Sequence, residues 1–98
     1  MKKFAFILMG PQYDMEKHQS AYETPGHLTS IFTVNTFEDA RKRALQCREE
    51  GYGCIELCGA FGEEKTREII ELTGGQMAVG YVIHLPEQDE LFERFFGG

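Results

Sequence analysis

The sequence predicts an α/β protein with a small four-stranded, mainly parallel sheet and flanking helices. Three observations lead to this prediction. Short apolar segments alternate with longer segments of helical spacing, the connections are short, and Gly or Pro marks most boundaries. Parallel strands need a connection long enough to recross the sheet, and the predicted helices provide it. The alternative is a ferredoxin-like α+β arrangement, if residues 12–28 form a loop that joins the first two strands as neighbours.

Residues 3–9 form the first predicted strand, a nearly continuous apolar run that a Gly-Pro pair ends. Such runs are typical of strands that are covered on both faces. The following residues 12–28 are polar and contain a Pro-Gly pair, which indicates a turn. Within this segment, residues 14–22 fit a short helix with Asp14 as its cap.

Residues 28–34 are rich in β-branched and aromatic side chains and form the second predicted strand. A capping pair, either Thr36 with Asp39 or Asn35 with Glu38, then begins a helix whose apolar residues recur at helical spacing up to Gly51. Residues 53–58 form the third predicted strand, because they are again a short run of strand-forming residues bounded by glycines.

The second half of the chain continues this alternation. A helix from Gly62 to the glycine pair at 74–75 is followed by the fourth predicted strand, residues 77–83. Pro86 begins a last helix. Four large apolar side chains lie on one face of it: Leu91, Phe92, Phe95 and Phe96. Because that face must be buried, we expect this helix to complete the core or to form a self-association surface.

The composition is that of a small acidic globular protein. The 98 residues fit one α/β domain spanning residues 1–98, with 42% hydrophobic and 27% charged residues. Asp and Glu outnumber Lys and Arg by 16 to 10, which gives a formal net charge of −6. A nucleic-acid backbone would be repelled by this charge, so we expect no nucleic-acid partner.

The cysteines and the apolar runs predict a cytoplasmic protein with no membrane partner. No run is long enough for a membrane helix, and no small-residue cleavage site follows the first apolar run. Cys47, Cys54 and Cys58 are an odd number without the paired framework of a secreted domain, so reduced thiols are expected. On an extended strand Cys54 and Cys58 would lie about 13 Å apart. That distance is too long for a disulfide or a shared metal ion, so we expect no metal, and the sequence demands no cofactor.

Three side chains near the predicted strand ends are candidates for chemistry: Glu56, Cys58 and His84. Ligands of parallel α/β sheets bind beyond the carboxyl ends of the strands. Glu56 places a carboxylate inside an apolar strand, where it would act as a general base or meet water at an open face. Cys58 precedes a predicted helix N-terminus, where it would be either a nucleophilic thiolate or, more often for a free cysteine, a buried inert thiol. His84 would end the fourth strand, as a catalytic or a structural histidine.

Backbone groups beside these side chains are candidates for ligand contact. Gly10, Gly59 and Phe61 follow the first and third predicted strands, and the amides of residues 59–62 lie at the start of a helix. Glu63 follows directly, and it would repel a phosphate. The segment also lacks a nucleotide-binding motif, so nucleotide binding is not expected.

The sequence resembles a family of short bacterial proteins of about 100 residues known only as a domain of unknown function. The similarity is carried by residues 56–63 (ELCGAFGE), 3–11 (KFAFILMGP), 78–81 (AVGY) and 84–91 (HLPEQDEL). It covers nearly the whole chain. The resemblance implies a free-standing small domain and transfers no activity or site residue.

These observations favour a small-molecule-binding domain, oligomeric, with its pocket at the carboxyl ends of the strands. The alternative is a cofactor-independent enzyme of isomerase or lyase type, in which Glu56 or His84 moves a proton and Cys58 assists. A structural interaction module is the second alternative. An enzyme requires these three side chains within hydrogen-bonding reach of one another, and a binding module does not.

Overall fold

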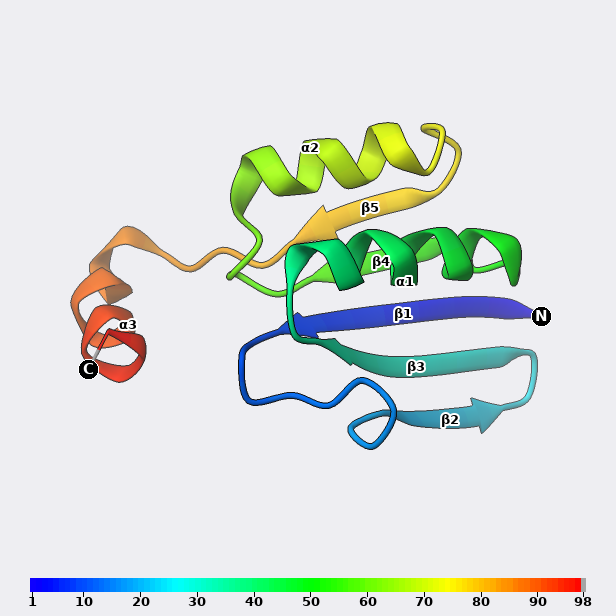
Figure 1. The fold of residues 1–98 in the computed structure, drawn as a ribbon, viewed down its shortest axis with the longest axis horizontal. Coiled ribbons are helices and arrows are strands. Elements are labelled where there is room, and N and C mark those ends of the chain that lie inside the picture. Colours follow the sequence, from blue (N-terminus) through cyan, green and yellow to red (C-terminus); the bar gives the residue numbers. More distant parts are fainter. Residues whose placement is uncertain (98) are drawn as a thin grey trace.

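The computed structural model describes residues 1–97 and shows an α/β fold built on one five-stranded sheet. The strands are, in spatial order, β2 (Ser20–Thr24), β3 (His27–Val34), β1 (Lys2–Met9), β4 (Cys54–Leu57) and β5 (Ala78–Tyr81) (Figure 1). All neighbours are parallel except β2 and β3. The mainly parallel α/β class is confirmed, with five strands where the sequence predicted four.

The additional strand is β2, which lies inside the polar segment 12–28. It pairs antiparallel with β3 through a two-residue turn at Pro25 and Gly26, and the positive φ of 80° at Gly26 suits glycine. The predicted helix over residues 14–22 is therefore wrong. Every residue of β2 is exposed, so this edge strand has no apolar alternation that would distinguish it from a loop.

Two helices cover one face of the sheet. Helix α1 (Phe37–Glu49) connects β3 to β4, helix α2 (Gly62–Leu72) connects β4 to β5, and both lie on the same side (Figure 1). This placement follows from two right-handed crossovers that proceed in the same direction across the sheet. Between the helices and the sheet lies the core, which includes Ala5, Ile7, Val34, Ala40, Ala44, Cys47, Ile55, Leu57 and Ile69.

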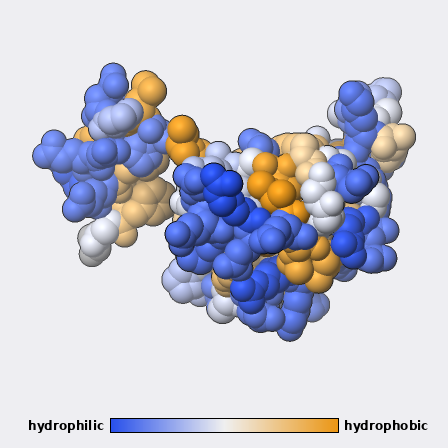
Figure 2. Space-filling view, turned by 90° about the horizontal axis from the view of Figure 1, so that it is seen from above, coloured by the Kyte–Doolittle hydropathy of each residue, from blue (hydrophilic) through white to orange (hydrophobic). Residues whose placement is uncertain are grey.

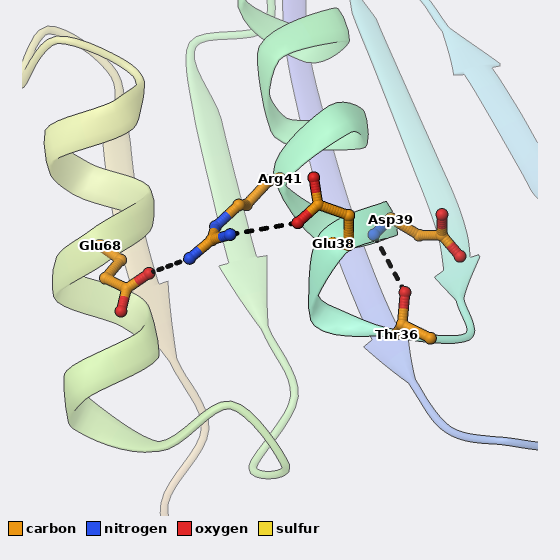
Figure 3. Close-up of polar contacts among 5 residues, drawn as sticks. All are labelled: Thr36, Glu38, Asp39, Arg41 and Glu68. Atoms are coloured by element: carbon orange, nitrogen blue, oxygen red, sulfur yellow. Dashed lines mark hydrogen bonds and ion pairs between the residues drawn. The ribbon is translucent and has the colours of Figure 1, made fainter.

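The start of α1 and its contact with α2 are fixed by polar side chains (Figure 3). Of the two predicted caps, Thr36 is the one that caps α1, because its Oγ1 accepts a hydrogen bond from the amide of Asp39 at 3.2 Å. The guanidinium of Arg41 donates to the carboxylates of Glu38 at 3.2 Å and Glu68 at 2.7 Å. The second contact joins α1 to α2.

The other face of the sheet has no helix over it among the described residues (Figure 1). Alternation along β1 places Phe4, Phe6 and Leu8 on this face, and Ile31 of β3 pairs with Phe6. We call the surface of these four side chains the open sheet face. They are only partly buried and lie outside the core cluster. The expectation that the first strand is covered on both faces is therefore wrong for the chain by itself.

The last part of the chain leaves the sheet. β5 ends at Tyr81, two residues before the predicted end of that strand, and residues 82–96 form an arm. The arm contains the short 3-10 helix η1 (Pro86–Gln88) and helix α3 (Asp89–Phe96). Figure 2 shows it as a separate lobe beside the rest of the molecule. No residue of α3 is buried, so the expectation that this helix completes the core is wrong.

None of the helices in the part of the chain that the structure describes is both long and apolar enough to cross a membrane.

Candidate functional site

The carboxyl ends of the four parallel strands lie along one edge of the sheet, where the sequence predicts a site (Figure 1). Asn35, directly after β3, organises this edge. Its Nδ2 donates to the carbonyl oxygens of Gly10 at 3.3 Å, Pro11 at 2.8 Å and Tyr13 at 3.0 Å. The loop that follows β1 is thereby held against the end of β3. Sequence analysis missed this role because an Asn after a strand indicates only that the strand ends.

Glu56 projects from β4 on the side of the open sheet face, between Phe6 of β1 and Gly80 of β5. Its Oε1 occupies the space that a Cβ on residue 80 would fill, so glycine at this position makes room for the carboxylate. The side chain is partly exposed. Among residues 1–97 it takes no part in a side-chain hydrogen bond or an ion pair.

Cys58 directly follows β4 and lies between the ends of β4 and β1. Its amide donates to the carbonyl of Ile7 at 3.1 Å, and its Sγ accepts a hydrogen bond from the amide of Met9 at 3.3 Å. A Cβ on the next residue, Gly59, would lie 3.4 Å from the carbonyl oxygen of Val82. The turn after β4 is therefore packed closely against the beginning of the arm, and the partly buried thiol is fixed at the carboxyl end of the sheet.

His84 belongs to the arm and does not end a strand, which corrects the predicted strand over residues 77–83. Its Nε2 lies 2.7 Å from Oδ1 of Asp89. Its ring stacks on Phe92 with 3.9 Å between centroids and 7° between planes. Both partners are in α3, and no hydrogen bond in residues 1–97 connects His84 with Glu56 or Cys58.

Phe61 is a core residue at the position where the sequence suggested a ligand contact. Its side chain is only 2% exposed and packs edge-to-face on Phe37, with 6.2 Å between ring centroids. It borders a shallow depression of about 380 Å³ beside Gly62 and the acidic first turn of α2. This depression presents Glu63 and Glu64, which disfavour an anion there.

A family model matches residues 2–97 of the chain. The chain belongs to DUF6506, a family of unknown function. The resemblance to a family known only as a domain of unknown function is thereby confirmed. No curated protein and no solved structure matches the sequence. Membership of DUF6506 therefore assigns no reaction and no ligand, and the site is argued from the geometry of this chain.

A larger depression of this DUF6506 chain lies away from the strand ends, on the helix side of β3. This groove, of about 680 Å³, is lined by the middle of β3, the last turns of α1, residues of the loop before β2, and Tyr52. The guanidinium of Arg43 lies 4.3 Å from the ring centroid of Phe32, and its Nη1 donates to Gln46 at 2.7 Å. Its buried Nε has no partner among residues 1–97. Sequence analysis missed the groove because Arg43 lies in a mixed charge cluster that indicates a solvated helix face.

The three cysteines of this DUF6506 chain are free. Burial raises the pKa of the Cys47 thiol to about 11, and burial followed by the nearby charge of Glu56 raises the pKa of Cys54. Among residues 1–97, no group of three His, Cys, Asp or Glu side chains is arranged to hold a metal ion.

Proposed function

We propose that the protein binds a small molecule on the carboxyl-end half of its sheet, with Glu56 as the main polar contact. The observation that carries the proposal is the position of the Glu56 carboxylate over Gly80 and beside Phe6. A carboxylate beside apolar side chains is costly unless it is hydrated or paired. The Glu56 carboxylate is accommodated by Gly80, and this arrangement is consistent with a ligand that pairs with the carboxylate.

The surroundings of Glu56 define the class of ligand. The carboxylate accepts hydrogen bonds and carries negative charge, so it favours an ammonium or another donor group. Phe6, its neighbour on β1, offers apolar contact to the rest of the molecule. Cys58, Gly59 and Gly10 border the same end of the sheet. We therefore propose a small amine with an apolar part.

The geometry supports binding over catalysis by the three predicted residues. An acid-base or thiol mechanism needs Glu56, Cys58 and His84 within hydrogen-bonding reach of one another. His84 is instead held by Asp89 and Phe92 inside the arm. Binding needs only Glu56 and its apolar surroundings.

The experiment is thermal unfolding of the protein in the presence of simple probes. Hexylamine and phenethylamine are the amines, and hexanol is the uncharged match for hexylamine. We expect both amines to raise the unfolding midpoint in a saturable way, and hexanol to have no such effect, because binding to the native state stabilises it. The effect should disappear in Glu56→Gln, and in Gly80→Ala, where the added methyl displaces the carboxylate.

The matched control is Glu71→Gln, an exposed carboxylate of α2. This variant loses the same charge and should keep the full response to both amines. The proposal is wrong if neither amine gives a saturable shift, or if Glu56→Gln responds as the wild type does.

The groove beside Arg43 is a second candidate site, because the buried Nε of this guanidinium has no partner among residues 1–97. This groove favours the opposite ligand charge to the Glu56 site, because an arginine binds a carboxylate. Hexanoate in the same assay tests it. A saturable shift by hexanoate that Arg43→Gln abolishes and Glu56→Gln preserves would support this site in place of the first.

A further inference from the structure

The arm exposes an unusually apolar surface. Phe95 and Phe96 are 79% and 75% exposed, and Ile83 is 75% exposed. With the exposed parts of Leu85, Leu91 and Phe92, these side chains present roughly 600–700 Å² of apolar surface, taking about 200 Å² for a whole aromatic side chain. Monomeric soluble proteins rarely expose a contiguous patch above a few hundred Å².

A second apolar surface, the open sheet face, is also uncovered. Phe4, Phe6 and Leu8 belong to a strand whose sequence is typical of one covered on both faces, yet the two helices cover only one. Tyr22 of β2, which is 58% exposed, extends the same face beyond β3. One chain thus carries two uncovered apolar surfaces of different shape, a helix and a sheet.

The total surface area points to a missing partner. The chain exposes 6675 Å². A compact folded monomer of 11.2 kDa exposes about 5,700 Å². The excess of about 1,000 Å² is close to the roughly 800 Å² that each partner buries in a standard protein interface. The radius of gyration of 13.9 Å likewise exceeds the roughly 12.6 Å expected for this length.

Residues 82–85 connect β5 to η1 and direct the arm away from the sheet of its own chain. The amide of Val82 still donates to the carbonyl of Leu57 at 2.9 Å, so the chain continues in the direction of β5. Leu85 is extended, with φ −68° and ψ 142°, and the following Pro86 disfavours a helical turn at this position. The chain therefore does not reverse toward its own open sheet face. A short extended connector of this kind suits exchange of an element between identical protomers.

We infer that two copies of this chain form a dimer in which the arm of each copy docks on the open sheet face of the other. The apolar side of α3 packs on Phe4, Phe6, Leu8 and Ile31 of the partner, and the partner's arm packs on the first copy in the same way. This inference goes beyond ligand binding at Glu56 and does not depend on it, although the docked arm would contact Phe6, which the proposed amine also contacts.

The area available is sufficient for a stable dimer. Two arms of roughly 600–700 Å² each, together with the sheet surface that they cover, bury more than the standard interface of about 1,600 Å². The aromatic side chains of α3 are of the type that dominates binding energy at interfaces. Phe95 and Phe96 already form a T-shaped pair, with 4.8 Å between ring centroids.

The first test is the mass of the full chain by light scattering and sedimentation. We expect twice the chain mass of 11.2 kDa. Replacing Phe95 and Phe96 by Ser should give monomers, with a dissociation constant raised at least a hundredfold and an unchanged circular dichroism spectrum, because neither side chain supports the core. The matched control is Ile70→Ser on α2, which removes another exposed apolar side chain and should leave the mass unchanged.

The second test shows which surfaces meet. The sheet variant carries Phe4→Thr and Ile31→Thr, because threonine is β-branched and suits a strand while removing apolar area. By itself it should be monomeric, like the arm variant, in which Phe95 and Phe96 are replaced by Ser. An equimolar mixture of the two should form a heterodimer, because the intact arm of one variant fits the intact sheet of the other. Tyr22→Ser, on the exposed edge strand, is a milder sheet variant that serves if the double variant unfolds.

Three outcomes would overturn the inference. A full chain that stays monomeric at high concentration would show that no exchange occurs. An arm variant that remains dimeric would point to pairing of the two sheets. A mixture of arm and sheet variants that stays monomeric would show that the arm does not bind the sheet. None of these outcomes depends on the amine response of Glu56, so the two proposals fail separately.

Discussion

The hydroxyl oxygens of Ser30 and Tyr52 lie 2.7 Å apart inside the protein, joining β3 to the segment between α1 and β4. Ser30 is 2% and Tyr52 7% exposed. Leaving a buried hydroxyl without a partner costs about 1–3 kcal/mol, so Tyr52→Phe should lower the free energy of unfolding by that amount. Urea denaturation measures it. The double variant Ser30→Ala, Tyr52→Phe should cost less than the sum of the single variants, and strict additivity would contradict this coupling.

The cap of α1 should matter more than the ion pairs beside it (Figure 3). Thr36→Ala removes the acceptor for the Asp39 amide and should lower the free energy of unfolding by about 1 kcal/mol. Arg41→Gln breaks the contacts with Glu38 and Glu68, but these side chains are all well exposed, so a smaller change is expected. Equal losses of unfolding free energy in the two variants would show that the contact between α1 and α2 stabilises the protein as much as the cap does.

Buried Cys47 should make the protein less stable at high pH. The ordinary thiol pKa of 9.0 applies to the unfolded chain, and burial raises the folded value to about 11. Below pH 9 both states hold the proton, so stability is constant. Between these values the unfolded thiol ionises first, and roughly 1–3 kcal/mol of stability should be lost as the pH rises. Urea denaturation across this range should show a weaker pH dependence in Cys47→Ala, and equal slopes would contradict the assignment.

Two glycines offer a matched test of backbone conformation. Gly26, in the turn between β2 and β3, has a φ of 80°, and a Cβ there would meet nothing within 4 Å. Gly26→Ala should therefore cost about 1–2 kcal/mol through backbone strain alone. Gly53 is equally uncrowded but has no positive φ. Gly53→Ala should be neutral or should stabilise by about 0.4–1 kcal/mol, as thermal unfolding would show. Similar losses in both variants would rule out this explanation.

The elements that bury apolar side chains were predictable from the sequence. The strands around Ile7, Val34 and Ile55, and the helix capped by Thr36, have patterns that follow directly from burial on one face. β2 was not predictable, because a fully exposed edge strand carries no such pattern. The position of the arm was not predictable either. An apolar helix face indicates that it is buried, but it does not indicate which chain provides the surface that covers it.

The candidate site was predictable only where strand alternation determines it. Glu56 projects on the expected face of its strand, and Cys58 lies at the expected strand end. His84 was misplaced because the strand before it ends at Tyr81, and its partners Asp89 and Phe92 are local contacts in the arm. The groove beside Arg43 depends on how α1 packs over β3, and no residue spacing in the sequence predicts that packing.

The central position of β1 has a consequence for synthesis of the protein. Phe4 pairs with Thr29 on one side and with Cys54 on the other, so the strand made earliest waits for partners made much later. At about 5–20 residues per second, several seconds pass between translation of β1 and of β4. Until β3 is made, the run from Phe4 to Met9 has no partner strand, and until β4 is made it has only one of its two. Such exposed apolar segments are prone to aggregation. The sheet is therefore completed only after its central strand has been made.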